Sequence, residues 1–184
     1  KQISPKFTRM SLEIKKIILD KRAQQRNVEE HQQEIANQII LYAELLKAGQ
    51  QFPPIVVCNT DEGMVLVDGH QRLCAYEMVG SKHVEADVFQ GTIDDVIFWA
   101  CGANKSHGLP ANSEGDKRKR TTTFLQNASC LSRIPSNSGI AQHLGVSESY
   151  IRKMMENLGI DLPSQRTVTK ADGTTYVIDI SWIG

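Results

Sequence analysis

Residues 65–75 of the chain read Val65-Leu66-Val67-Asp68-Gly69-His70-Gln71-Arg72-Leu73-Cys74-Ala75. The pattern predicts a buried strand that stops at Gly69 and passes directly into a helix that carries His70 and Arg72. The start of a helix has unused backbone N–H groups and the positive end of a dipole, so it attracts anions. A glycine lets the backbone approach a ligand, and an arginine can bind phosphate through two parallel hydrogen bonds. We therefore expect an anion site at this point of the chain.

Three side chains of this segment are candidates for chemistry, and each has a structural alternative. Arg72 is expected to bind phosphate, and the alternative is a structural salt bridge. His70 can act as an acid, a base or a neutral donor, or it can simply cap the turn. Asp68 can hold a metal, although a carboxylate beside a phosphate pocket more often orients the arginine.

Alternation and turn signals predict the elements on both sides of this segment. A strand is expected at 12–19, and Asn27 with Glu30 has the spacing of a capping box. Apolar residues at 28, 35, 39, 42 and 46 then predict an amphipathic helix that ends at Gly49. The further expected elements are strands at 55–58, 64–67 and 84–89, a helix at 70–79, a helix from Thr92 through Cys101, a loop at 104–112 and a helix at 113–129.

The rest of the chain divides into a helical part and a tail. A change in composition at 133–139, Arg-Ile-Pro-Ser-Asn-Ser-Gly, marks a boundary ahead of a second motif. Asp172-Gly173 lies between two β-rich runs in the tail at 167–180, which predicts a hairpin. The expected fold class is α+β, with a small mixed sheet and flanking helices, then an all-α helix-turn-helix segment and a short C-terminal β-hairpin. The corresponding domain ranges are 1–111, 112–160 and 161–184.

The second motif, at 140–154, has the pattern of a helix-turn-helix. Ala141 is small where the second helix crosses the first, Gly145 takes the turn, and Ser147 caps the next helix. The outward residues of that helix are then expected to face a major groove of DNA: Ser149, Tyr150, Arg152 and Lys153. The alternative is a helical hairpin that binds no nucleic acid, because this unit also serves in protein contacts.

A basic run lies just upstream of the helix-turn-helix, on a predicted helix. It consists of Lys117, Arg118, Lys119 and Arg120. Beside a DNA-reading motif, such a run indicates contacts with the phosphate backbone. The alternative is a solvated helix face with no partner.

The bulk composition excludes several classes of protein. With 21 Lys and Arg against 21 Asp and Glu, the formal net charge is zero, so any polyanionic partner must be bound by local charge. The longest apolar runs are far too short to cross a bilayer, and no secretory signal is visible. The four scattered cysteines lack metal-ligand spacing and are expected as buried free thiols, which predicts a cytoplasmic protein.

In its order of segments the chain resembles the ParB-like branch of the ParB/sulfiredoxin superfamily, over about residues 12–160. Gln25-Arg26 stands where these proteins have Gln-Pro-Arg, and residues 53–57 are similar to their Pro-Ile-x-Val strand. Residues 68–75 are similar to the Gly-Glu-Arg-Arg or Gly-His-x-Arg box. Residues 103–108 are similar to the Ala-Asn-x-x-His-Gly form of plasmid- and phage-borne relatives. The resemblance implies a ParB/sulfiredoxin-like fold and a bacterial protein.

The resemblance also implies ligands and site residues. In partition proteins of this family the pocket binds and hydrolyses a nucleoside triphosphate with magnesium, so ATP or CTP with Mg²⁺ or another divalent cation is implied here. Phosphate contacts are implied for Arg26, Gly69, His70 and Arg72, and a metal or phosphate contact for Asn104. Other members are nucleases, and some plasmid-encoded members act against the transfer of competing plasmids as fertility-inhibition factors of the oncogenic-suppression (Osa) type.

The chain departs from the family pattern at the site itself. His70 replaces the glutamate of the phosphate box and Ala103 replaces the metal-side glutamate, so magnesium-dependent hydrolysis does not transfer directly. The reactive cysteine of sulfiredoxin would align with His70. Cys74 is expected to point elsewhere on the helix, which disfavours sulfinic-acid repair. The chain is also expected to lack the long C-terminal dimerisation domain of partition proteins.

Three functions remain open from the sequence. The first is an enzyme that hydrolyses nucleotide, cleaves DNA or does both, with Asp68, His70, Arg72 and His107 as the catalytic set. The second is a plasmid partition or transcription factor that binds a specific DNA site, as a dimer on a palindrome, and only senses nucleotide. The third is a factor that contacts and blocks a conjugation or partition machine. The first is preferred slightly over the second.

Overall fold

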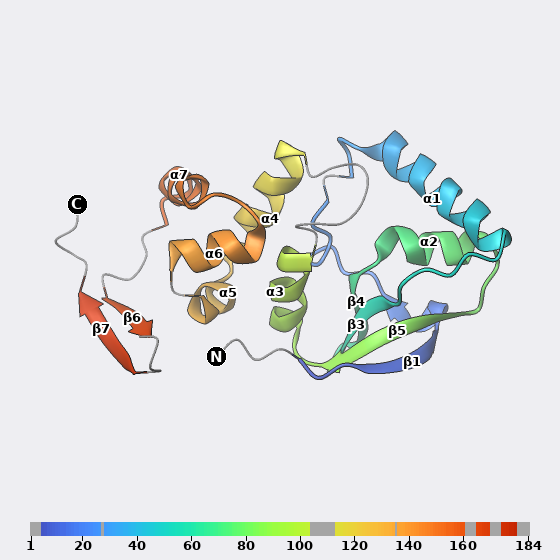
Figure 1. The fold of residues 1–184 in the computed structure, drawn as a ribbon, viewed down its shortest axis with the longest axis horizontal. Helices are drawn as coiled ribbons and strands as arrows, with labels where there is room; N and C mark the ends of the chain where they lie inside the picture. Colours follow the sequence, from blue (N-terminus) through green and yellow to red (C-terminus); the bar gives the residue numbers. More distant parts are fainter. Residues whose placement is uncertain are drawn as a thin grey trace.

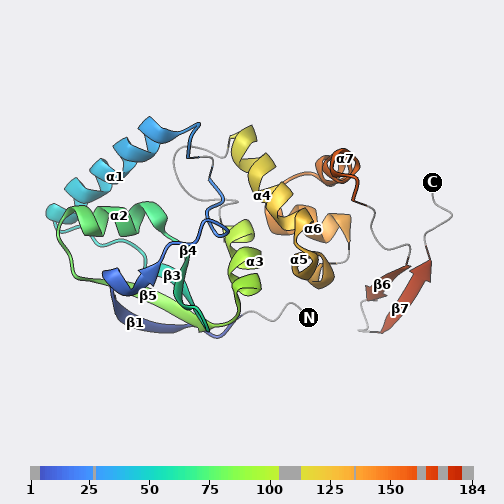
Figure 2. The same cartoon turned by 180° about the vertical axis from the view of Figure 1, so that it is seen from behind.

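The computed structural model describes residues 5–26, 28–103, 113–134, 136–160, 165–169 and 174–179. A five-stranded sheet carries helices on both faces, and a group of further helices lies beyond one of them (Figures 1 and 2). None of the helices in the described part of the chain combines the length and the apolar character that a membrane span requires.

The sheet is mixed, as expected, and its strand order is β1-β5-β3-β4-β2. β1 pairs antiparallel with β5, β5 parallel with β3, β3 antiparallel with β4, and β4 parallel with β2. The strands are β1 (Thr8–Glu13), β2 (Ile17–Ile18), β3 (Ile55–Thr60), β4 (Gly63–Asp68) and β5 (His83–Gln90).

The single strand expected at 12–19 is wrong. A short 3₁₀ helix, η1 (Ile14–Lys16), separates β1 from β2. Ile14 and Ile17 are both buried in the same core, and their spacing of three residues suits a turn better than a strand, in which every second residue shares a face. The backbone N–H of Ile14 donates to the carbonyl of Lys82, which fixes the break (3.0 Å).

One face of the sheet packs against α2 (His70–Met78), and α1 (Gln32–Lys47) packs on α2 (Figure 1). The expected α1 begins late, because 28–31 form turns and Gln32 is its first residue; Asn27 lies outside the described residues. The capping box therefore does not start this helix. Its end near Gly49, which has a φ of 88°, is as expected.

The opposite face of the sheet packs against α3 (Ile93–Ala103). Strand alternation separates the two cores: Val57 and Leu66 belong to the α2 side, whereas Cys58 and Val65 belong to the α3 side. All four cysteines are free thiols; three are buried, as expected, and Cys74 is half-buried.

A separate helical core contains α4 (Glu114–Gln126), α5 (Ala128–Arg133), α6 (Asn137–Leu144) and α7 (Glu148–Leu158). The helix expected at 113–129 is wrong in one respect, because it breaks at Asn127, whose side chain caps α5 by accepting from the N–H of Cys130 (3.0 Å). The change in composition at 133–139 does not divide the packing, since helices on both sides of it share this core.

α3 belongs to both halves of the molecule and lies between the sheet and the other helices (Figure 2). Its Val96 and Ala100 are in the sheet-side core, and its Ile97 and Cys101 are in the helical core. These two pairs lie on different faces, because residues four apart share a face of a helix. The tail forms a hairpin of β6 (Gln165–Thr169) and β7 (Thr175–Asp179), as expected; Asp172-Gly173 lies outside the described residues.

Candidate functional site

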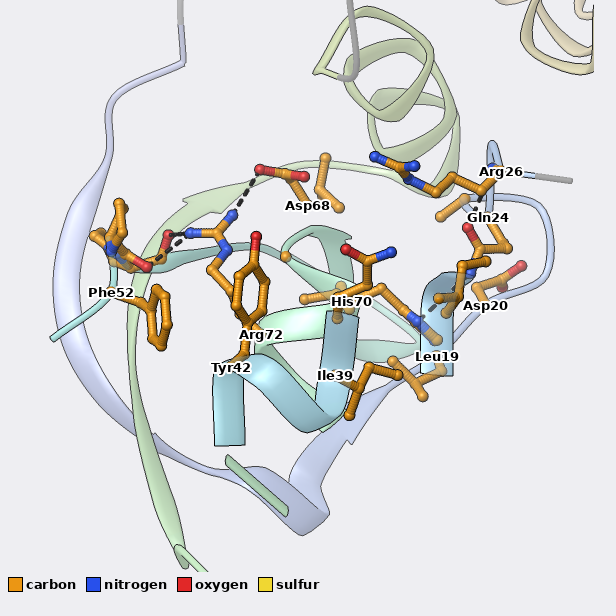
Figure 3. Close-up of a pocket in the computed structure, with 18 of the residues that line it drawn as sticks. Leu19, Asp20, Gln24, Arg26, Ile39, Tyr42, Phe52, Asp68, His70 and Arg72 are labelled. Atoms are coloured by element: carbon orange, nitrogen blue, oxygen red, sulfur yellow. Dashed lines mark hydrogen bonds and ion pairs between the residues drawn. The ribbon is translucent and has the colours of Figure 1, made fainter. Parts of the chain in front are cut away.

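A cavity of about 670 Å³ lies at the start of α2, between that helix, α1 and the segment that precedes α1 (Figure 3). The described residues at its polar end are Asp20, Lys21, Gln24, Arg26, Asp68, Gly69, His70, Gln71 and Arg72. Its apolar wall includes Leu19, Val28, Ile35, Ile39, Tyr42 and Phe52. The sequence placed Ile35, Ile39 and Tyr42 on the apolar face of α1 but gave no reason to expect a cavity there.

Gly69 makes the sharp passage from strand to helix that the sequence predicted. It has a φ of 102°, and a Cβ there would lie 2.7 Å from Cγ2 of Ile55, so only glycine fits. No side chain caps α2, and the first backbone bond of the helix joins the N–H of Leu73 to the carbonyl of Gly69 (2.9 Å). The first N–H groups of α2 therefore have no partner within the helix and lie at the cavity.

Arg72 has the structural role that was the alternative at this position. Its Nη1 donates to the carbonyls of Pro53 and Pro54, both at 2.7 Å, and its Nη2 donates to Asp68 at 2.9 Å. Only 17% of the side chain is exposed. The guanidinium thus links the start of α2 to the start of β3. Asp68 orients this guanidinium, which is the second of the two roles that the sequence suggested for Asp68. A phosphate contact by Arg72 stays a prediction.

His70 lies half-buried at the same helix start. Burial lowers the pKa of its imidazole, and the negative charge of Glu77 opposes that effect as the smaller cause. Nε2 of Gln24 lies 3.4 Å from Nδ1 of His70, and since the amide nitrogen can only donate, Nδ1 is the acceptor (Figure 3). The imidazole can therefore offer an N–H, from Nε2, to a ligand.

The carboxylates that line the described part of the cavity are all paired with arginine. Asp20 pairs with Arg22 at 2.6 Å, Asp68 with Arg72 at 2.9 Å, and Asp87 with Arg9 at 2.9 Å. Among the described residues no group of three His, Cys, Asp or Glu side chains could hold a metal ion. These carboxylates therefore do not fit the divalent cation that the resemblance implies. Asn104 and His107, the other predicted ligand and catalytic residue, lie outside the described residues.

Arg26 supplies a cationic side chain at the edge of the cavity, on the side opposite Arg72 (Figure 3). Its backbone N–H donates to the side chain of Gln24 (3.2 Å), and its carbonyl accepts from Nζ of Lys119 in α4 (2.8 Å). The sequence singled out Arg26 but missed Gln24, whose only signal was its place beside the Gln-Arg pair.

The helix-turn-helix is present as expected. α6 ends at Gly145, which has a φ of 65°, and the side chain of Ser147 accepts from the N–H of Tyr150 (3.2 Å) to cap α7. Ala141 and Ile151 are buried between the two helices and their neighbours. On the outer face Ser149, Arg152 and Lys153 are exposed, whereas Tyr150 is half-buried against the helical core. DNA contacts by these residues stay a prediction.

The basic run divides into outward and inward side chains. Arg118 is exposed, and Lys117 pairs with Glu114 at 2.5 Å. Lys119 is half-buried and faces the carbonyl of Arg26. Arg120 is 1% exposed, and its Nε donates to the carbonyl of Leu144 at 3.1 Å, so assigning it to DNA was wrong: a side chain packed in the core cannot reach a phosphate.

No protein-family model matches the chain. A curated relative from Streptomyces griseus, described as a possible regulatory protein of the streptomycin biosynthesis operon, is 30% identical over 82 residues. That match covers 45% of this chain and 23% of the relative, so the chain spans less than a quarter of that protein.

Solved structures match over more of the chain. C-terminally truncated ParB from Caulobacter crescentus, complexed to the centromeric parS site, is 16% identical with a TM-score of 0.50, over 83% of this chain and 73% of that one. The same protein complexed with CTP-gamma-S is 17% identical with a TM-score of 0.44, and that match covers 84% of this chain and 80% of the other. Sulfiredoxin from Arabidopsis thaliana is 16% identical with a TM-score of 0.39, and that match covers 48% of this chain and 92% of sulfiredoxin. The chain therefore shares its mixed α+β fold with ParB from Caulobacter crescentus, in agreement with the fold class that its sequence predicts.

Proposed function

We propose that this chain binds duplex DNA through α7 and holds a nucleoside triphosphate in the cavity at the start of α2. The observation that carries the DNA-binding part is the capped helix-turn-helix with Ser149, Arg152 and Lys153 exposed on the outer face of α7. In a helix-turn-helix this face enters the major groove, and cations beside it contact phosphates. The likeness of the fold to a ParB complexed to parS, and a relative described as regulatory, support the same proposal.

The cavity suits a nucleotide in size and chemistry. Its volume of about 670 Å³ lies within the usual range of small-molecule sites, about 300–1,000 Å³. Unused N–H groups at the start of α2 and the cation of Arg26 favour phosphate, and Nε2 of His70 adds a hydrogen-bond donor. Tyr42 and Phe52, whose ring centroids are 4.7 Å apart, give the apolar wall an aromatic surface suited to the nucleoside.

We propose that the cavity binds and senses nucleotide, because the carboxylates that line it within the described residues are each paired with an arginine. One observation favours turnover as a second candidate. Nδ1 of His70 can accept a proton from attacking water in exchange for its hydrogen bond from Gln24, so His70 is the described side chain best suited to assist hydrolysis.

The test uses the full chain in two assays. Binding of a random duplex library is measured by gel retardation across salt, where affinity should fall steeply and fall further in Arg152→Ala. Binding of CTP and ATP is measured by calorimetry, with Arg26→Ala expected to weaken binding about tenfold or more. Arg152→Ala, which removes the same charge on α7 and not at the cavity lining, is the matched control for nucleotide binding.

The outcomes separate the parts of the proposal. If no duplex is retarded at low salt, the DNA-binding function is wrong; if neither triphosphate binds, the nucleotide pocket is wrong. Phosphate release and plasmid nicking, measured with and without magnesium, decide turnover. Release that disappears in His70→Ala would establish hydrolysis in place of sensing.

A further inference from the structure

The exposed face of α7 carries an ion pair that the fold does not need. Arg152 pairs through Nη2 with Oε1 of Glu148, four residues earlier, and the two side chains are 66% and 41% exposed. Exposed pairs of this kind contribute little to stability. Such a pair instead biases a long side chain toward one orientation.

That orientation is set at the end of the helix that enters the groove. Ile151, Met154 and Met155 are buried on the inner face of α7, so Arg152 projects from the opposite side within the first two turns. In helix-turn-helix proteins it is the N-terminal part of the second helix that contacts base edges. The ion pair engages one terminal nitrogen, and the planar fork has further donors to offer.

The chemistry of a restrained arginine in a major groove is specific. The fork matches O6 and N7 of guanine, which together form an acceptor pair that no other base offers there. A carboxylate behind the guanidinium repels phosphate and favours a base edge over the backbone. Lys153, the next residue, has a point charge on a flexible stem, which suits backbone phosphates but does not read sequence.

We propose that Arg152, held in place by Glu148, reads a guanine, so that each half-site bound by this protein contains a G·C pair opposite the second turn of α7. The proposal rests on the proposed DNA-binding function and adds the base that the site recognises. Glu148 is a positioning residue in this scheme, and Arg152 makes the base contact.

The experiment selects binding sites from a random duplex library with the full chain and sequences them. Wild type should enrich a G·C pair at one position of each half-site, and replacement of that pair by A·T should weaken binding about tenfold to a hundredfold. Arg152→Lys keeps the positive charge but loses the paired donors of the guanidinium. This variant should therefore lose the preference for G·C at that one position and keep the salt dependence of binding.

Two further variants separate recognition of the base from non-specific electrostatic attraction to the phosphate backbone. Lys153→Ala should keep the selected sequence while the slope of log affinity against log salt falls by about one. Glu148→Gln removes an anion and the restraint, so non-specific affinity should rise while the guanine preference weakens.

The inference is overturned if Arg152→Lys selects the wild-type site unchanged, or if the wild-type site has no guanine that depends on Arg152. A wild-type chain that retards no DNA at low salt would instead overturn the proposed function itself. Circular dichroism of each variant checks that the overall helix content is unchanged.

Discussion

Nζ of Lys119 in α4 donates a hydrogen bond to the backbone carbonyl of Arg26, 2.8 Å away, across 93 residues of sequence. The next residue, Arg120, donates from the same helix to the carbonyl of Leu144 at the end of α6. One turn of α4 therefore contacts both the wall of the cavity and the turn of the helix-turn-helix.

Replacing Lys119 should loosen the cavity wall at a measurable cost. Lys119→Met removes a half-buried charged hydrogen bond, and we expect the free energy of unfolding to fall by about 1 kcal/mol. Lys117→Met is the matched control, because the pair that Lys117 makes with the exposed Glu114 should contribute no more than about 0.5 kcal/mol. Urea denaturation measures both, and equal losses in the two variants would contradict a special role for Lys119.

Arg120 should behave as a core residue and Arg118 as a surface one. Arg120→Met leaves the carbonyl of Leu144 without this donor and removes a cation beside the buried Asp116, so a loss of about 2–4 kcal/mol is expected. Arg118→Met should change stability by no more than about 0.5 kcal/mol but should reduce the salt dependence of DNA binding. Thermal unfolding and gel retardation give the two readouts, and a stable Arg120→Met protein would show the assignment to be mistaken.

Two glycines around α2 allow the backbone strain to be separated from the close contact. Gly69→Ala meets both a positive φ and a Cβ only 2.7 Å from Ile55, so at least about 2 kcal/mol should be lost. Gly80 has a φ of 78° with open space around it, so Gly80→Ala should cost about 1 kcal/mol from strain alone. Chemical denaturation should rank Gly69→Ala as the more damaging of the two. If Gly80→Ala proved more damaging than Gly69→Ala, the backbone between β4 and α2 would have to move enough to accommodate a Cβ at residue 69.

Acid should weaken the fold through His70. Because burial lowers the pKa of His70 in the folded state, the unfolded chain binds a proton more readily. Stability should therefore fall as pH drops below about 6.5, the unfolded value, and level off below the folded pKa. The imidazole titration followed by NMR gives the folded pKa, and His70→Gln should flatten the pH dependence of unfolding over this window. A pKa at or above 6.5 would refute the expectation.

The elements that the sequence predicted well are those whose signals are local. Gly69 marks the passage from strand to helix, and Gly145 with Ser147 marks the turn and cap of the helix-turn-helix, since each acts on its own backbone neighbours. The break at η1 was missed because the tertiary packing of Ile14 and Ile17 in one core overrides the strand pattern.

The roles of the basic residues could not be predicted for a different reason. Arg72, Lys119 and Arg120 each donate to backbone carbonyls of distant segments. Every residue has a carbonyl, so such an acceptor leaves no mark in the sequence. A charged side chain that binds one is indistinguishable, before folding, from a charged side chain that awaits a phosphate.

α3 contributes one face to the sheet-side core and another to the helical core, and the ring of His143 lies so close to Gly102 that a Cβ there would be 2.6 Å from it. Neither half can complete its interior without this helix. The two halves should consequently melt in a single cooperative transition, and a fragment that begins at Ser113 should fail to fold by itself. Evolution can therefore not exchange the half that contains the helix-turn-helix for another module without also rebuilding α3.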